Sequence, residues 1–302
     1  MKTYLHLTIL LFILSNVFLS ACESNLIPTP LKTPIPILTT IYTQMLTPAS
    51  TLPLTPTLTP TTTTYPIPMI CESAAVANVG EYQAIMDDWG KGSLTGWSQC
   101  IGAMIDANGA LVGRWTWDWL NSGGNVKSFP AIVFGQLPST TSTTLSLPAK
   151  INNIDTATVS YNVSSTHSGS GNLILHMWLT NTNNPTTWGV PPITHEIIIA
   201  LEVYGEMQPA VPWRKQVRID EISYDLFMGD DFGMGWRFIV FTRTPYQQGS
   251  GTLNLVNFLS TLQKEGLITG NEYLASISFG NEVVSGVGET NLKDYVITVR
   301  QK

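Results

Sequence analysis

The sequence predicts an all-β fold, an antiparallel sandwich or jelly roll with a single helix. From residue 71 onward, short runs rich in Val, Ile, Thr and aromatic residues alternate with Gly, Asn and Pro turns, which is the pattern of strands. Clear runs lie at 156–164, 172–180, 236–242 and 295–300. Only residues 252–265 show helical spacing, with one apolar stripe and Gly266 as a C-terminal stop. Many strands and one helix are typical of a sandwich or jelly roll.

The first 21 residues predict an export signal. Lys2 supplies a positive start, and the apolar run from Leu5 to Leu19 is too short for a comfortable membrane span. The run ends in Leu-Ser-Ala-Cys22, which resembles the bacterial lipobox, where cleavage precedes a cysteine whose thiol carries a lipid. We expect an extracytoplasmic protein, either anchored to the membrane at the cell surface through Cys22 or secreted. The alternative is an ordinary secretory signal with an incidental cysteine.

Residues 22–70 predict a Thr/Pro-rich tether between the anchor and a domain over 71–302. Lys32 is the only charged residue between positions 24 and 70, and frequent prolines disfavour helix. The chain has three cysteines, Cys22, Cys71 and Cys100. If Cys22 is lipidated, an even pair remains, and in an oxidising compartment it can form a disulfide that stabilises the fold by roughly 3 kcal/mol.

Composition excludes some functions. The net charge of −6 leaves no basic face for nucleic acid. The four histidines show no metal-ligand spacing, so we expect no metal or cofactor. Separately, we expect the protein to be a monomer. Nine tryptophans suggest both core packing and a stacking surface. Trp115, Trp117 and Trp119 share one strand face, and for them core packing is the alternative to stacking.

Strand alternation places two glutamates outside the core. In residues 195–203 one face carries Ile197, Ile199, Leu201 and Val203, and the other carries Glu196, Ile198, Ala200 and Glu202. In residues 274–282 Ala275, Ile277 and Phe279 form the apolar face, while Ser276, Ser278, Gly280 and Glu282 form the other. Small residues around Glu282 leave room for a bulky group, although a merely solvated face is the alternative.

A third strand carries a histidine on the corresponding face. Its inward residues are Leu173, Leu175, Met177 and Leu179, and its cleft-side residues are Ile174, His176 and Trp178. A partly buried imidazole with satisfied hydrogen bonds is the alternative for His176.

Five ordered motifs resemble glycoside hydrolase family 12, the jelly-roll endo-β-1,4-glucanases and xyloglucanases. They are Asp88-Trp89-Gly90, the cysteine pair Cys71 and Cys100, the block 115–130, the strand start Glu196-Ile-Ile-Ile-Ala200, and the segment Phe279-Gly-Asn-Glu282 with the glycines after it. The resemblance implies a concanavalin-like β-jelly roll, with two packed antiparallel sheets, a concave substrate cleft and one helix.

The resemblance also implies a chemistry. Two carboxyls flank a β-1,4 bond of cellulose-type glucan, mixed-linkage glucan or xyloglucan, and hydrolysis proceeds with retention. Glu196 matches the nucleophile and Glu282 the acid/base residue. Trp89 matches a platform on which a glucosyl ring on the non-reducing side stacks, and we expect Trp117 and Trp178 also to contact substrate.

Two positions depart from the family pattern. His176 stands where the family usually has an aspartate that hydrogen-bonds the nucleophile, so we expect His176 to contact Glu196. Ala200 stands where tryptophan is usual, which predicts either a wider groove for branched glucans or reduced activity. The alternative function is a carbohydrate-binding jelly roll without catalysis, although retention of both glutamates favours the enzyme.

Overall fold

The computed structural model describes residues 67–119, 124–231, 233–243, 245–246 and 248–302. The expected signal at 1–21, the lipidation site Cys22 and the tether up to residue 66 lie outside the described residues. In the part of the chain that is described, no helix has the length and apolar character needed to cross a membrane.

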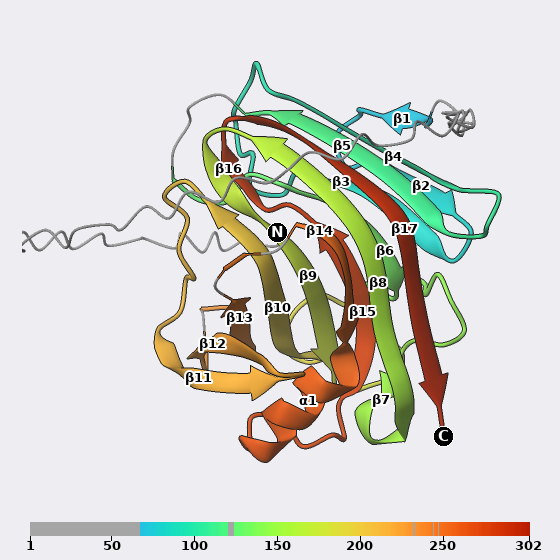
Figure 1. The fold of residues 1–302 in the computed structure, drawn as a ribbon, viewed down its shortest axis with the longest axis vertical. Coiled ribbons are helices and arrows are strands. Elements are labelled where there is room, and N and C mark those ends of the chain that lie inside the picture. The colour runs from blue at the N-terminus through green and yellow to red at the C-terminus, as the bar shows by residue number, and fades with distance from the viewer. Residues whose placement is uncertain (1–66, 120–123, 232, 244, 247) are drawn as a thin grey trace, which may run out of the picture. The chain divides into compact units, whose positions relative to one another are not determined.

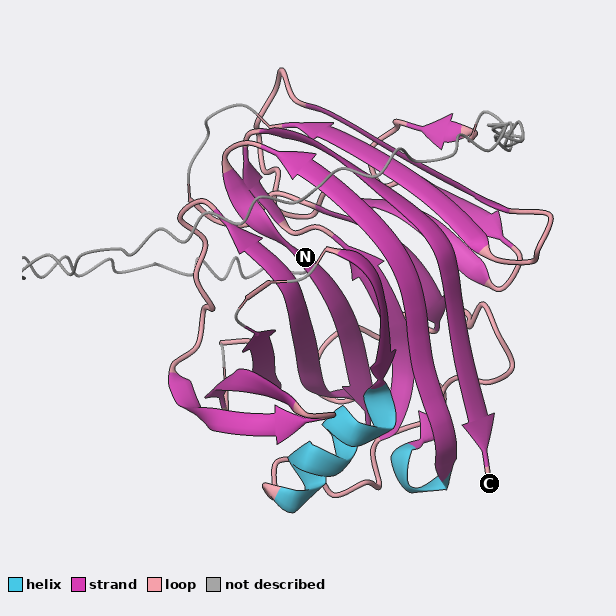
Figure 2. Ribbon diagram, viewed as in Figure 1, coloured by secondary structure: helices cyan, strands magenta, loops and turns pink. Residues whose placement is uncertain are grey.

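Two β-sheets make up the domain, as the sequence predicts (Figures 1 and 2). The outer sheet has six strands in the order β1 (Met69–Ile70), β4 (Ser98–Ile105), β5 (Leu111–Asp118), β17 (Val287–Gln301), β8 (Ile154–His167) and β14 (Gly249–Asn254).

The cleft sheet has eleven strands. Nine follow the order β11 (Trp213–Ile219), β12 (Ile222–Gly229), β13 (Arg237–Arg243), β10 (Ile193–Tyr204), β9 (Ser170–Thr180), β15 (Tyr273–Gly280), β6 (Phe129–Gly135), β3 (Tyr82–Asp87) and β2 (Val76–Val79). The remaining two are β16 (Val283–Ser285), which pairs with β9, and β7 (Ala149–Lys150), which pairs with β15 and precedes a 3-10 turn at Ile151–Asn153. Among the described strand pairs, β10 and β13 are parallel and all others are antiparallel.

The main core lies between the two sheets, where the alternating apolar residues meet. The inward residues predicted for β9 are all there, namely Leu173, Leu175, Met177 and Leu179. The opposite face of the cleft sheet holds a second apolar cluster that includes Ile174, Ile198 and Ala200. The cleft sheet is therefore apolar on both faces at its centre, and polar side chains on its outer face stand out.

A β-bulge in β10 changes the predicted alternation. Ala200 pairs with Ile174 but Glu202 pairs with Leu173, so Leu201 is an extra residue in the strand. Beyond the bulge the faces exchange, and Val203 lines the cleft instead of the core. The expectation that Glu202 shares the face of Glu196 is wrong, because Glu202 contacts the His167 imidazole at 3.3 Å.

The single helix of the described residues begins later than predicted. α1 spans Leu255–Lys264, and Asn254 caps it by accepting a hydrogen bond from the Val256 amide. Residues 252–254 belong to β14, where pairing with β8 outweighs the helical spacing. Gly266 ends the helix region with a positive φ of 67°, as the sequence predicts.

The N-terminal edge of the domain starts before the predicted boundary at residue 71. Met69 and Ile70 form β1 and pair with β4 at Gly102 and Ile101. The disulfide between Cys71 and Cys100 is confirmed, and it fixes this edge strand to β4.

Candidate active site

A cleft with a volume of about 190 Å³ lies on the face of the cleft sheet that points away from the main core. Both predicted glutamates line it, together with Trp89 at its rim and Ile198, Ala200, Val240 and Phe238 on its floor. The floor residues come from β10 and β13, and the segment 207–210 forms a wall. Glu196 and Glu282 are therefore polar groups in a mostly apolar hollow.

Two side chains hold the carboxylate of Glu196. The Nε2 atom of His176 lies 3.2 Å from Glu196 Oε1, which confirms the expected contact. The indole N–H of Trp236 donates a hydrogen bond to Glu196 Oε2 at 3.0 Å. Each oxygen thus has its own partner, and the carboxylate is fixed in orientation.

Trp236 was not predicted from the sequence. It precedes β13, and it meets Glu196 because β13 runs parallel to β10, with Arg237 opposite His195. Parallel pairing between strands distant in the chain leaves no local sequence signal. The sequence predicts a strand over 236–242, but nothing in it indicates that the Trp236 indole meets Glu196.

Asn172 brackets Glu282 from the start of β9. Its side-chain amide donates to Glu282 Oε2 at 2.6 Å, and its Oδ1 accepts from the Glu282 backbone N–H at 2.9 Å. The Asn172 backbone N–H also donates to the Glu282 carbonyl at 3.0 Å. Burial raises the pKa of Glu282, the Asn172 hydrogen bond opposes this by stabilising the charged form, and the negative charge of Glu196 raises the pKa further.

Asn281 anchors the Glu282 segment to the core between the sheets. Its Oδ1 accepts hydrogen bonds from the Trp115 indole and the Thr290 hydroxyl, both at 2.8 Å, and its amide donates to the Asn172 carbonyl at 2.7 Å. Trp115 and Thr290 belong to β5 and β17 of the outer sheet. Buried networks of this kind hold one geometry, so the outer sheet helps to position the acid/base candidate.

A third carboxyl lies on the same side of the sheet. Asp87 ends β3 beside Phe129, whose ring packs edge-on against His176 with centroids 5.6 Å apart. Burial raises the pKa of Asp87, and the net result is a pKa of about 6. The hydrogen bond from the Trp89 backbone N–H lowers this pKa. The charge of Asp88 raises the pKa and the charge of His176 lowers it by smaller amounts. Among the described residues no group of three or more His, Cys, Asp or Glu side chains is placed to hold a metal ion.

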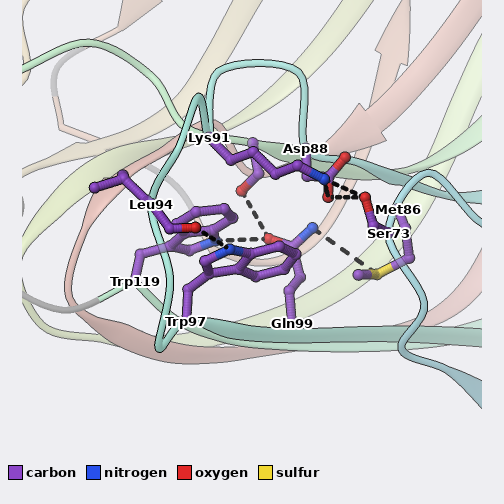
Figure 3. Close-up of polar contacts among 9 residues, drawn as sticks. Ser73, Met86, Asp88, Lys91, Leu94, Trp97, Gln99 and Trp119 are labelled. Atoms are coloured by element: carbon purple, nitrogen blue, oxygen red, sulfur yellow. Dashed lines mark hydrogen bonds and ion pairs between the residues drawn. The ribbon is translucent and has the colours of Figure 1, made fainter.

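Trp89 lies on a loop whose neighbouring residues make polar contacts. Asp88 accepts from the Ser73 hydroxyl at 2.6 Å and pairs with Lys91 at 2.7 Å (Figure 3). A side chain at Gly90 would collide with the Val126 carbonyl oxygen, so this position needs glycine. The loop leaves Trp89 63% exposed, which suits the expected stacking platform.

Two expected substrate contacts are wrong. Trp117 is 2% exposed within the main core, where its ring lies against Gly288, and the alternative of core packing holds for Trp115 and Trp119 as well. Trp178 is also buried, and it packs edge-on against His176, Trp188 and Trp236. Trp178 therefore supports the two partners of Glu196 and does not line the cleft.

The fold and the site together define the class of protein. Two carboxyls in one cleft, one with a hydrogen bond on each oxygen and one with a raised pKa, suit hydrolysis of a glycosidic bond, and the exposed tryptophan at the rim suits a sugar ring. The chain is a glycoside hydrolase of the jelly-roll type.

The chain belongs to glycosyl hydrolase family 12, whose family model matches residues 80–300. It is 27% identical over 227 residues to endoglucanase S of Pectobacterium parmentieri, covering 73% of this chain and 82% of that protein. A family 12 xyloglucanase from Bacillus licheniformis, solved with a ligand, is 26% identical with a TM-score of 0.66, covering 77% of this chain and all of that one. Endoglucanase cel12A from Rhodothermus marinus shares the fold, at 23% identity and a TM-score of 0.66, over 78% of this chain and 99% of that one.

Proposed function

We propose that this protein is an endo-acting, retaining hydrolase of β-1,4-linked glucans, with Glu196 as nucleophile and Glu282 as acid/base residue. The observation that carries the proposal is the contrast between the two carboxyls of one cleft. Glu196 accepts hydrogen bonds on both oxygens, whereas burial and the charge of Glu196 favour the protonated form of Glu282. The similarity to endoglucanase S supports a glucan as the substrate.

The reaction has two steps. The ionised carboxylate of Glu196 attacks the anomeric carbon while the proton of Glu282 passes to the leaving glycosidic oxygen. Glu282, now a carboxylate, takes a proton from water, which attacks the same carbon and releases Glu196. During this exchange Asn172 holds the carboxyl of Glu282 in place, and its amide hydrogen bond favours the charged form that the second step needs.

The shape of the cleft favours a branched glucan. Ala200 lies on the floor of the cleft, together with Ile198 and Val240, where the family resemblance expects a tryptophan. A side branch of xyloglucan has room there that an indole would fill. The likeness to the Bacillus licheniformis xyloglucanase is in keeping with this preference.

Release of reducing sugar tests the proposal. Wild-type protein is incubated with carboxymethylcellulose, barley β-glucan and xyloglucan, beside Glu196→Gln and Glu282→Gln. We expect release by the wild type and a loss of at least about 1,000-fold in each variant, as for removal of a reacting group. Binding of these glucans without any release by the wild type would instead indicate a carbohydrate-binding protein.

We further propose that the mature chain is a monomeric lipoprotein, held outside the cytoplasm by Cys22 and the Thr/Pro tether. The sequence Leu-Ser-Ala-Cys22 after an apolar run supports the anchor. The Cys71–Cys100 disulfide supports export, because such bonds persist in oxidising compartments. Mass spectrometry of the N-terminal peptide should show a lipid on Cys22; an unmodified thiol would exclude the anchor, and sedimentation tests the monomer.

A further inference from the structure

An exposed tryptophan lies at the edge of the cleft sheet that is far from Trp89. Trp213 begins β11, the last strand on that side, and is 59% exposed. Its indole N–H donates to Asp225 Oδ1 on the neighbouring strand at 3.2 Å. Leaving so much apolar ring in water while holding it in a fixed orientation suggests a ligand for its face.

The ring lies on the cleft face of the sheet. In β12 the side chains of Tyr224, Leu226 and Met228 enter the main core, so Asp225 and Phe227 project to the other side. Phe227 packs against the same apolar cluster that contains Ile198 and Ala200. Since Trp213 pairs with Phe227 and bonds Asp225, its indole belongs to the face that holds the cleft.

Paired strands lead from the cleft to this tryptophan, although the cleft lining itself ends at β13. Thr242 lines the cleft on β13, pairs with Asp225 on β12, and Asp225 pairs with Gln216 on β11. Neighbouring strands are about 4.8 Å apart, so Gln216, two strands away, lies about 10 Å from Thr242. The wall at 207–210 leads directly along the chain to Trp213.

The order of strands puts Trp89 and Trp213 on opposite sides of the glutamates. Trp89 follows β3, near one edge of the cleft sheet, and Trp213 lies on β11 at the other (Figure 1). Glu196 is on β10 and Glu282 follows β15, so both lie between them. A glucan that runs across the strands and contacts Trp89 and both glutamates therefore extends beyond the glutamates toward Trp213.

We propose that Trp213, oriented by Asp225, is a distal glycosyl-binding platform that takes a further sugar ring of a long β-1,4-glucan, on the side of the cleft opposite Trp89. The inference rests on the proposed function. The apolar C–H face of a β-linked sugar stacks on the indole, and the polar row of Thr242, Asp225 and Gln216 offers hydrogen bonds to its hydroxyls. The platform is out of reach of short substrates, so it selects for chain length.

The test compares oligosaccharides of two lengths. Cellotetraose and cellohexaose are digested by the wild type, Trp213→Ala and Trp213→Phe, with the position of the cleaved bond read from products labelled at the reducing end. Trp213→Ala should lower kcat/KM on the longer substrate by about two- to tenfold, the worth of one aromatic contact, with little change on the shorter one. It should also shift cleavage toward the reducing end, and Trp213→Phe should restore most of the loss.

A control variant distinguishes a sugar-binding platform from a general effect of substitution on the enzyme. Val296→Ala removes an exposed apolar side chain from β17 of the outer sheet and should change the hydrolysis of neither substrate. Equal losses on both lengths, or no loss on either, would overturn the platform. If no substrate is cleaved at all, the proposed function fails, and the platform is then judged by calorimetric binding of cellohexaose to Glu196→Gln with and without Trp213→Ala, where equal affinities would reject it.

Discussion

At the scale of single residues, the two glutamates differ because their surroundings differ. Trp236 and His176 supply hydrogen bonds to both oxygens of Glu196. Glu282 is half-buried, its carboxyl accepts one side-chain hydrogen bond, from Asn172, and the charge of Glu196 raises its pKa. The raised pKa of Glu282 suits an acid that acts beside a nucleophile.

Neutralising Glu196 should lower the pKa of Glu282. A negative charge nearby disfavours a second one, so Glu196→Gln removes one of the causes that raise the Glu282 pKa. Titration of the labelled Glu282 carboxyl by NMR, in Glu196→Gln and in the wild type, measures the shift. Glu289→Gln, which changes a carboxylate paired with Arg114 on the outer sheet, is the control and should leave the Glu282 pKa unchanged. An equal pKa in all three proteins would mean that the two carboxyls do not interact.

Asp87→Asn should stabilise the protein above neutral pH. The folded-state pKa of about 6 exceeds the unfolded value of about 3.9, so ionised Asp87 favours unfolding. This penalty is fully present above the folded pKa and disappears as pH falls below the unfolded one. Urea unfolding should show a gain of at most about 2–3 kcal/mol at about pH 8 and none below about pH 4. Exposed Asp155→Asn is the matched control, and a gain independent of pH would argue against the buried charge.

At the scale of elements, strand alternation predicted β9 and the first part of β10 well. Each inward residue of β9 is in the core, and Glu196, Ile198 and Ala200 share the cleft face. The local sequence does not predict the bulge at Leu201, because the bulge depends on how β10 pairs with β9. Helical spacing likewise misplaced residues 252–254, whose backbone pairs with β8.

Filling the floor of the cleft should change which glucan is preferred. Ala200→Trp places an indole on the cleft floor next to Ile198 and opposite Thr242, so hydrolysis of xyloglucan should fall by about tenfold relative to linear glucan, the cost of losing one well-fitted branch contact. The ratio of initial rates on the two polymers measures the effect, with the melting temperature confirming that the variant folds. Ala200→Val, which adds less volume, should have a smaller effect. Parallel losses on both glucans would argue against a site for branches.

Removing the disulfide should release the N-terminal edge strand. Cys71 and Cys100 are 29 residues apart, and closing a loop of this length stabilises a fold by about 3–4 kcal/mol in the chain-entropy model. For a domain of this size, the Cys71→Ser and Cys100→Ser double variant should melt about 6–16 °C lower in calorimetry. Its activity at low temperature should persist, because neither cysteine lines the cleft. An unchanged melting temperature would show that β1 contributes its stability without the bond.

At the scale of the whole molecule, the sequence predicts the architecture and the two glutamates. It does not predict the residues that hydrogen-bond them, because those residues are brought close by strand pairing. The period-two patterns predicted two packed sheets, and the ordered motifs predicted Glu196 and Glu282. Trp236 reaches Glu196 through the parallel β10–β13 pair, and Asn172 on β9 reaches Glu282 because β15 and β16 both pair with β9. Burial determines which tryptophans are available to a sugar ring, since Trp89 and Trp213 are exposed while Trp117 and Trp178 are not. Composition alone does not distinguish a tryptophan that stacks on sugar from one that fills a core.

The central claim is that Glu196 forms the bond to the sugar and Glu282 moves the proton. Trapping with an activated fluorosugar of cellobiose, followed by mass spectrometry of the peptides, identifies the residue that carries the glycosyl group. We predict a single label on Glu196 in the wild type and none in Glu196→Gln, with products of retained configuration. A label on Glu282, or an inverted product without any label, would contradict this assignment.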